Sequence, residues 1–172
     1  MKKLSEKTIL KTPVFDVVEK ELENTSFKPV GLNCKDWCLI YAYDNENLLL
    51  VKQTRYGIEN QTIEYPCGTV EDGEEPIDAV VRELLEETGI EVDKKDVESV
   101  GSFNPNPAYF NNKMHVFAVE IPDLKEKLEH HKELMLDENE DCEPFIADKG
   151  DKKILTPSGI TLAANYILFC RV

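Results

Sequence analysis

Three glutamates, Glu83, Glu86 and Glu87, fall close together in the segment GTVEDGEEPIDAVVRELLEETGI, which spans residues 68–90. On a helix, residues three and four positions apart are neighbours, so these carboxylates repel one another by roughly 0.2–0.5 kcal/mol per pair. One explanation is a solvated acidic face on an acidic protein. The other is a site for hard divalent cations, which require oxygen ligands and offset the repulsion.

The sequence around the glutamates predicts a helix docked on a core. Pro76 suits the first position of a helix, and Gly89 suits the left-handed position just past its end. At 100° per residue one face carries the residues that must pack inward: Ile77, Val80, Val81, Leu84 and Thr88. The glutamates project to the other side within an arc of about 100°, so they can converge on one point while the helix stays docked.

Composition limits the kinds of partner. The chain has 172 residues, of which 41% are hydrophobic and 31% charged, as expected for a single globular domain with a real core. Its net charge of −14 argues against binding nucleic acid or an anionic membrane. The negative charge of the protein would repel a phosphate compound, and bound divalent cations would offset that repulsion.

The cysteines and the N-terminal segment indicate a cytoplasmic protein. Five cysteines occur, an odd number without paired spacing for a zinc site: Cys34, Cys38, Cys67, Cys142 and Cys170. They are interpreted as thiols in a reducing compartment. The first residues lack the apolar stretch of a secretory signal, and no run of 18 apolar residues predicts a membrane span.

The remaining pattern predicts a mixed α/β or α+β domain. Strands are expected at residues 14–18, 37–43, 48–53, 62–65, 97–103 and 113–121. A turn is expected at residues 44–47. Besides the glutamate helix, residues 123–134 could form a charged surface helix, and another is expected to begin at Thr156 and Pro157.

The glutamate segment resembles the Nudix box, G-x5-E-x7-R-E-U-x-E-E-x-G-U, in which U is a bulky aliphatic residue. It matches at every specified position: Gly68, Glu74, Arg82, Glu83, Leu84, Glu86, Glu87, Gly89 and Ile90. The resemblance implies an α/β class fold, an α/β/α sandwich with a mixed β-sheet, formed by residues 1–172 as one domain. It also implies hydrolysis of a nucleoside diphosphate linked to another group.

The same resemblance assigns roles within the box. It implies a ligand set for Mg²⁺, or for Mn²⁺: Glu83, Glu87, Glu86 and the backbone carbonyl of Cys67 or Gly68. Glu86 and Arg82 are also expected among the catalytic residues, with Arg82 orienting the glutamates by charge-assisted hydrogen bonds. Bound metal ions would neutralise the diphosphate and lower the pKa of a water molecule. Whether Cys67, beside such metals, is redox-active stays open.

Flanking segments are similar to those of ADP-ribose pyrophosphatases. The approach to the box matches at Gln53, Arg55, Glu64, Pro66 and Gly68, whereas Cys67 replaces the usual small alanine. By this resemblance Arg55 clamps the diphosphate through its bidentate geometry, and Glu64 contributes to substrate binding.

Downstream, Pro105 lies 16 residues past Gly89, a spacing associated with ADP-ribose-type members, and is expected near the substrate. However, the following Asn106-Pro107-Ala108 and Asn112 depart from the family pattern, so these positions indicate the reaction type without identifying the substrate.

The acidic loop at residues 137–141 resembles one that delivers a catalytic glutamate over the metals. Glu138 or Glu140 would be the general base or a further metal ligand. The sequence does not decide between the two.

The leading hypothesis is Mg²⁺-dependent cleavage of ADP-ribose into AMP and ribose 5-phosphate. The alternatives are GDP-mannose, NADH, a dinucleotide or a nucleoside triphosphate as substrate, or a non-catalytic nucleotide-sugar sensor. Sensors generally lose box glutamates, and this chain retains them. The resemblance also implies a homodimer that exchanges N-terminal strands, here at about residues 10–35. Oligomeric state and metal preference stay open.

Overall fold

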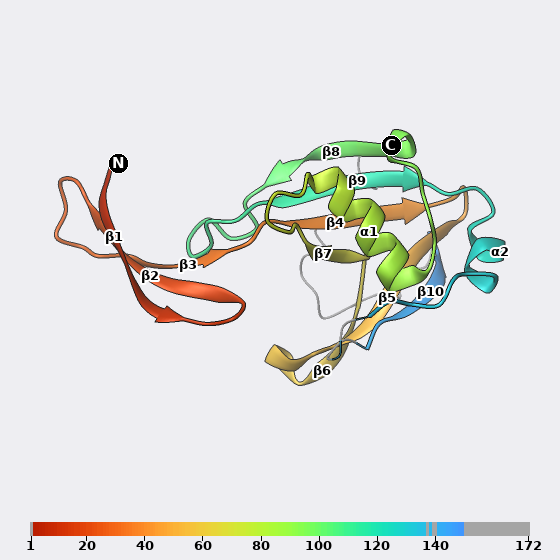
Figure 1. Cartoon of the computed structure of the whole chain (residues 1–172), viewed down its shortest axis with the longest axis horizontal. Coiled ribbons are helices and arrows are strands. Elements are labelled where there is room, and N and C mark those ends of the chain that lie inside the picture. Colours follow the sequence, from red (N-terminus) through yellow and green to blue (C-terminus); the bar gives the residue numbers. More distant parts are fainter. Residues whose placement is uncertain (1, 137, 139–140, 150–172) are drawn as a thin grey trace.

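The computed structural model describes residues 2–136, 138 and 141–149, which form two β-sheets and few helices. A small N-terminal sheet lies apart from the main body in Figure 1, and the main body contains a larger sheet crossed by one long helix. Among the described residues, no helix is long and apolar enough to cross a bilayer.

The larger sheet has seven strands in the order β10-β5-β4-β9-β8, with β6 paired to β5 and β7 paired to β4. Their bounds are β4 (Trp37–Tyr43), β5 (Asn47–Arg55), β6 (Asn60–Glu64), β7 (Cys67–Thr69), β8 (Val97–Phe103), β9 (Met114–Glu120) and β10 (Glu143–Asp148). β4 and β9 run parallel and the other pairs antiparallel, so the sheet is mixed, as predicted. The short strands β7 and β10 were not predicted.

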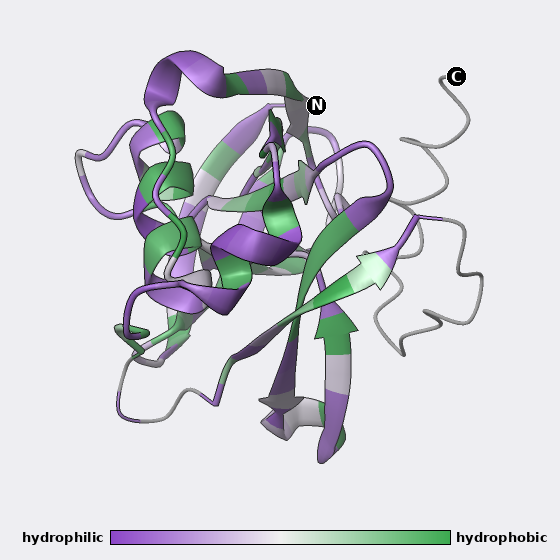
Figure 2. Cartoon of the chain, turned by 90° about the vertical axis from the view of Figure 1, so that its right-hand side faces the viewer, coloured by the Kyte–Doolittle hydropathy of each residue, from purple (hydrophilic) through white to green (hydrophobic). Residues whose placement is uncertain are grey.

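Helix α1 (Pro76–Thr88) covers one face of this sheet. Its predicted inner face is confirmed, because Val80, Leu84 and Thr88 are fully buried while Ile77 and Val81 pack against the same cluster. Gly89 follows with a φ of 68°, the left-handed conformation in which glycine carries no steric penalty. Figure 2 shows the resulting alternation of hydrophobic and hydrophilic residues along the helix. The docked face fixes the direction of the glutamates.

Helix α2 (Leu124–Glu129) is shorter than the predicted 123–134, and it follows a left-handed Asp123 with a φ of 58°. The residues after it pair with the end of α1 instead of continuing as helix. Lys132 N donates to Gly89 O at 3.1 Å, and Met135 N donates to Glu86 O at 3.1 Å. These bonds satisfy carbonyls that the C-terminus of a helix leaves without intrahelical partners. The helix predicted from Thr156 lies outside the described residues.

The N-terminal sheet contains β1 (Lys3–Lys11), β2 (Phe15–Leu22) and β3 (Val30–Cys34). Only part of β2 was predicted. Every residue of β1 is exposed, because the strand pairs with β2 and no core covers it. The proline-rich loop after β8 holds β3 in place, since Leu32 N donates to Tyr109 O at 2.7 Å and Asn111 N donates to Leu32 O at 3.2 Å.

Two short 3₁₀ turns complete the described part of the chain, η1 (Tyr56–Ile58) and η2 (Lys94–Asp96). The first connects β5 to β6, the hairpin that extends below the main body in Figure 1. Glu59 closes this turn in a left-handed conformation with a φ of 52°.

Candidate active site

Arg82 is the centre of an acidic network on the outer side of α1. Its guanidinium donates to Glu74 through Nε and Nη2, both at 3.0 Å, and through Nη1 to Glu83 at 2.7 Å and Glu86 at 2.9 Å. A fifth bond joins Nη2 to Thr69 O at 2.8 Å. A guanidinium has five N–H donors, so Arg82 is saturated.

This network explains how neighbouring carboxylates coexist on one helix. Hydrogen bonds from Arg82 lower the pKa of the Glu74 carboxyl below its usual range, and those to Glu74 and Glu83 raise the pKa of Arg82. One delocalised cation therefore offsets part of the repulsion between Glu83 and Glu86. The predicted orienting contacts of Arg82 are present in the structure.

The strand β7 holds the other side of the glutamate group. Glu87 is only 6% exposed, and its Oε2 accepts a hydrogen bond from Cys67 N at 3.0 Å. Glu83 lies so close to Gly68 that a β-carbon on Gly68 would overlap its carboxylate. A side chain at position 68 would therefore displace the Glu83 carboxylate from its place beside β7.

These glutamates line a cavity of about 930 Å³ between α1, β7 and the β5–β6 hairpin. That volume is within the usual range for small-molecule sites. The wall also includes Arg55, Glu64, Cys67 and Gly68, which were predicted to bind substrate or metal, and Arg82, which was predicted to orient the glutamates. The sequence-predicted residues of the box and its approach therefore meet in one place.

Arg55 and Glu64 form a bidentate ion pair in the cavity wall. Arg55 Nε and Nη2 donate to the two carboxylate oxygens of Glu64 at 2.9 and 3.0 Å, and Thr62 Oγ1 also donates to Glu64. Burial favours the neutral acid, but the bonds from Arg55 and Thr62 outweigh it and lower the pKa of Glu64. The guanidinium of Arg55 at the cavity wall is therefore already paired with Glu64.

Cys67 also faces the pair, since Arg55 Nη2 lies 3.6 Å from its Sγ. Burial, and then the Glu87 carboxylate, raise the pKa of the Cys67 thiol well above its usual range. The thiolate is the form that oxidants attack, so this environment disfavours a redox role for Cys67.

Neither Glu138 nor Pro105 lines the cavity in the described part of the chain. Glu138 is exposed and is not part of the cavity wall, and Glu140 lies outside the described residues. Pro105 belongs to the loop that holds β3 and does not line the cavity. Their assignments remain predictions.

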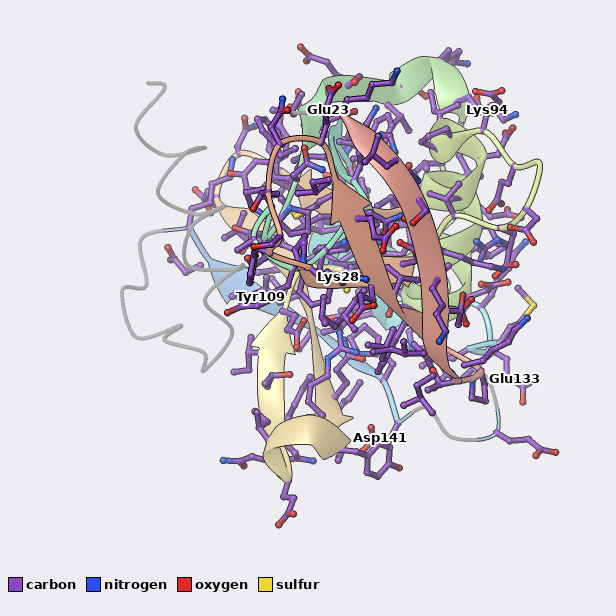
Figure 3. The ribbon with its side chains drawn as sticks, turned by 90° about the vertical axis from the view of Figure 1, so that its left-hand side faces the viewer. Glu23, Lys28, Lys94, Tyr109, Glu133 and Asp141 are labelled. Carbon is purple, nitrogen blue, oxygen red and sulfur yellow. The ribbon has the colours of Figure 1, made fainter. Side chains whose placement is uncertain are left out.

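One residue of the acidic loop, Asp141, is bonded to β5, and Met135, which precedes the loop, lines the cavity. Asp141 Oδ1 accepts from Thr54 N at 2.8 Å, which ties the loop to β5, and Figure 3 shows Asp141 beside the β5–β6 hairpin. Met135, on the other side of the loop, lines the cavity.

Several cavity residues were not singled out as site residues from the sequence: Trp37, Leu39, Gln53, Tyr56, Ile58 and Met135. Tyr56 and Met135 are 72% and 55% exposed and form an apolar rim beside the charged groups of the site. The exposed Tyr56-Gly57 pair directly after Arg55 was a usable signal for this rim. Met135 carried none, because its position depends on the contact with α1.

The donor set fits a hard divalent cation, although the carboxylates do not form a closed cage. Within residues 2–136, 138 and 141–149, no three carboxylate, thiol or imidazole side chains form a metal cluster. Arg82 is instead the group that Glu83 and Glu86 share. Their carboxylates and that of Glu87 line one cavity and are only partly exposed or buried, and oxygen ligands of this kind are those that Mg²⁺ prefers.

Comparison with known proteins gives a family and a fold. The family model described as NUDIX domain matches residues 35–147. The ADP-ribose pyrophosphatase of Bacillus subtilis (strain 168) is 34% identical over 150 residues, covering 81% of this chain and 77% of that protein. The methanol dehydrogenase activator of Bacillus methanolicus is 34% identical over 88 residues, or 51% of this chain and 46% of that protein.

A solved structure described as an ADP compounds hydrolase superposes with a TM-score of 0.75 and 18% sequence identity. It covers 99% of this chain and 92% of that chain. At this level of identity the likeness establishes the fold, and it agrees with the mixed sheet and α1.

Proposed function

Because this chain belongs to the Nudix family and is a Nudix hydrolase, we propose that it hydrolyses the pyrophosphate bond of a nucleoside diphosphate sugar. ADP-ribose is the proposed substrate, giving AMP and ribose 5-phosphate. The observation that carries the proposal is that one cavity is lined both by the three glutamates and by Arg55. The Bacillus subtilis relative named ADP-ribose pyrophosphatase supports the substrate.

Glu83, Glu86 and Glu87 would hold Mg²⁺, with a backbone carbonyl at Cys67 or Gly68. Bound there, the metal supplies charge neutralisation of the diphosphate and a more acidic water molecule. Arg82 holds Glu83 and Glu86 in place, so the carboxylates need little reorganisation at the moment of reaction. Arg55 would bind the phosphates by exchanging its contacts with Glu64 for phosphate oxygens, which match a guanidinium equally well.

The homodimer is part of the same proposal. The β1–β2–β3 sheet and its β2–β3 loop leave large apolar side chains uncovered, among them Leu4, Ile9, Leu10, Phe27 and Val30, each at least 46% exposed. A second copy that pairs with this sheet would bury them. Glu138 and Glu140 are proposed as alternatives for the catalytic residue of the acidic loop.

A hydrolysis panel tests the proposal. The protein would be incubated with Mg²⁺ and ADP-ribose, GDP-mannose, UDP-glucose, NADH, diadenosine polyphosphates or deoxynucleoside triphosphates, and the products separated by chromatography. AMP and ribose 5-phosphate formed from ADP-ribose, and lost in Glu83→Gln, is the expected result. Cleavage of another compound alone would move the substrate, and binding without any cleavage would contradict catalysis.

A further inference from the structure

Gln53 differs from the rest of the cavity wall because its side-chain nitrogen is unsatisfied. The residue is 8% exposed and lines the cavity, and within the described part of the chain its Nε2 makes no hydrogen bond. A buried donor without a partner destabilises the folded state, so such groups are rare and call for an explanation.

The strand register places Gln53 beneath the ion pair of Arg55 and Glu64. In the β5–β6 ladder, Gln53 pairs with Thr62. Two residues from Gln53 along β5 lie Val51, which pairs with Glu64, in one direction and Arg55 in the other. Alternate residues of a strand share a face, so these side chains lie on the same side of the hairpin. Arg55 lies four residues along β5 from Val51, the partner of Glu64. Because Arg55 and Glu64 still bond, their side chains reach across the position of Gln53.

We propose that Gln53 Nε2 donates a hydrogen bond to a phosphate oxygen of the substrate, beside the guanidinium of Arg55. This inference rests on the proposed function and deepens it. An anion is the acceptor that can draw Arg55 away from the Glu64 carboxylate and so uncover the donor below it. A sugar hydroxyl is too weak an acceptor to compete with a bidentate ion pair. The final torsion of a glutamine side chain is soft, so the amide can turn toward the incoming oxygen.

A binding role and a structural role predict opposite effects on the free protein. If Gln53 serves the ligand, Gln53→Leu removes an unpaired buried donor, and the ligand-free protein melts at the same or a higher temperature. If Gln53 holds the hairpin together, the same change lowers the melting temperature. Gln61→Leu is a matched control, since Gln61 is an exposed glutamine on the neighbouring strand and does not line the cavity.

The experiment measures binding by isothermal titration calorimetry and melting by differential scanning calorimetry. The wild type, Gln53→Leu, Gln53→Glu and Gln61→Leu would each be titrated with ADP-ribose, ADP and inorganic pyrophosphate. Ca²⁺ would replace Mg²⁺ as a hard oxygen-seeking cation, with chromatography to verify that the ligands remain intact.

The expected result is binding about tenfold or more weaker in Gln53→Leu for all three ligands, as for a hydrogen bond to a charged group. Gln53→Glu is expected to bind more weakly still, because it brings a carboxylate toward the phosphate. Gln61→Leu should bind like the wild type. A lowered melting temperature in Gln53→Leu, unchanged binding, or a loss confined to ADP-ribose would overturn the inference.

The two proposals fail in different ways. If the wild type binds pyrophosphate and ADP but not ADP-ribose, the proposed substrate is wrong, while the comparison of Gln53 variants on the diphosphate still decides the inference. If the wild type binds none of the three ligands, the assignment of Gln53 to phosphate is overturned as well.

Discussion

The outer face of α1 and the N-terminal sheet use polar and apolar side chains in opposite ways. On α1, Glu83, Glu86 and Glu87 are partly or fully buried and every donor of Arg82 is used. On β1, every residue is exposed, including the apolar Leu4 and Leu10. The first region is held together by hydrogen bonds within one chain, and a divalent cation is proposed to bind its carboxylates. The second leaves the whole of β1 exposed in the single chain, and a second copy is proposed to cover it.

Glu83→Gln should give the largest effect of those considered, because it removes one proposed metal ligand and one contact of Arg82. Hydrolysis of ADP-ribose in Mg²⁺ is expected to fall at least about a hundredfold, since changes even to the partners of metal ligands cost 10–100-fold. Steady-state kinetics would measure kcat and KM. Glu98→Gln on β8, an exposed glutamate outside the cavity wall, should retain full activity. Equal activity in both variants would show that the α1 face is only a solvated surface.

Arg82→Ala should lower kcat about 10–100-fold by releasing the glutamates from their fixed positions. Arg82→Lys is expected to rescue little, because an ammonium group cannot reproduce five hydrogen bonds in a planar arrangement. The same kinetic assay, with circular dichroism to verify folding, checks both variants. Full rescue by lysine would mean that only the charge matters and that the geometry of the network does not.

Leu10→Asp tests the N-terminal sheet without changing the face of α1. Leu10 is 56% exposed in the single chain, so the substitution should change the free energy of unfolding of the protomer by only about 0.5 kcal/mol. If a second copy covers β1, the added charge should convert a dimer into a monomer, measured by light scattering coupled to size-exclusion chromatography. Ser99→Asp, at an exposed position of β8, adds the same charge to the larger sheet and should leave the dimer intact. A wild type that is monomeric at all concentrations would remove the need for a protein partner.

Glu74→Gln should have the smallest effect, and it should depend on pH. Arg82 lowers the pKa of Glu74 in the folded protein, so the stabilisation is fully present above the unfolded value of about 4.3. It is lost as pH falls through the folded pKa. We expect Glu74→Gln to lower the free energy of unfolding by on the order of 1 kcal/mol at pH 7, and by less at pH 3. Urea unfolding at both pH values measures this difference, and an equal loss at both would show that the charge of Glu74 is irrelevant.

Elements with strong local signals were predicted well. The predicted bounds 37–43 and 97–103 coincide with β4 and β8, and the α1 start at Pro76 and the glycine at its end are confirmed. In α1 a clear hydrophobic period runs between Pro76 and Gly89, so its local and tertiary preferences agree.

Elements that depend on distant partners were missed or misjudged. β1 has no buried face, so it lacks the alternation by which strands are recognised, and it exists because β2 pairs with it. The predicted helix at 123–134 ended early, since the backbone of Lys132 and Met135 bonds to the end of α1. The hydrophobic periodicity of a segment does not show whether its backbone will bond to a distant element instead of continuing a helix.

By itself the sequence determined the family, the reaction class and the glutamate face, because the box residues lie on one helix where spacing fixes direction. Only the tertiary structure decided what those groups meet. It placed Gly68 under the Glu83 carboxylate, paired Arg55 with Glu64 over Gln53, and brought Met135 to the rim of the cavity. Each of these contacts joins residues from different elements, and the distance between such residues is set by packing and strand register.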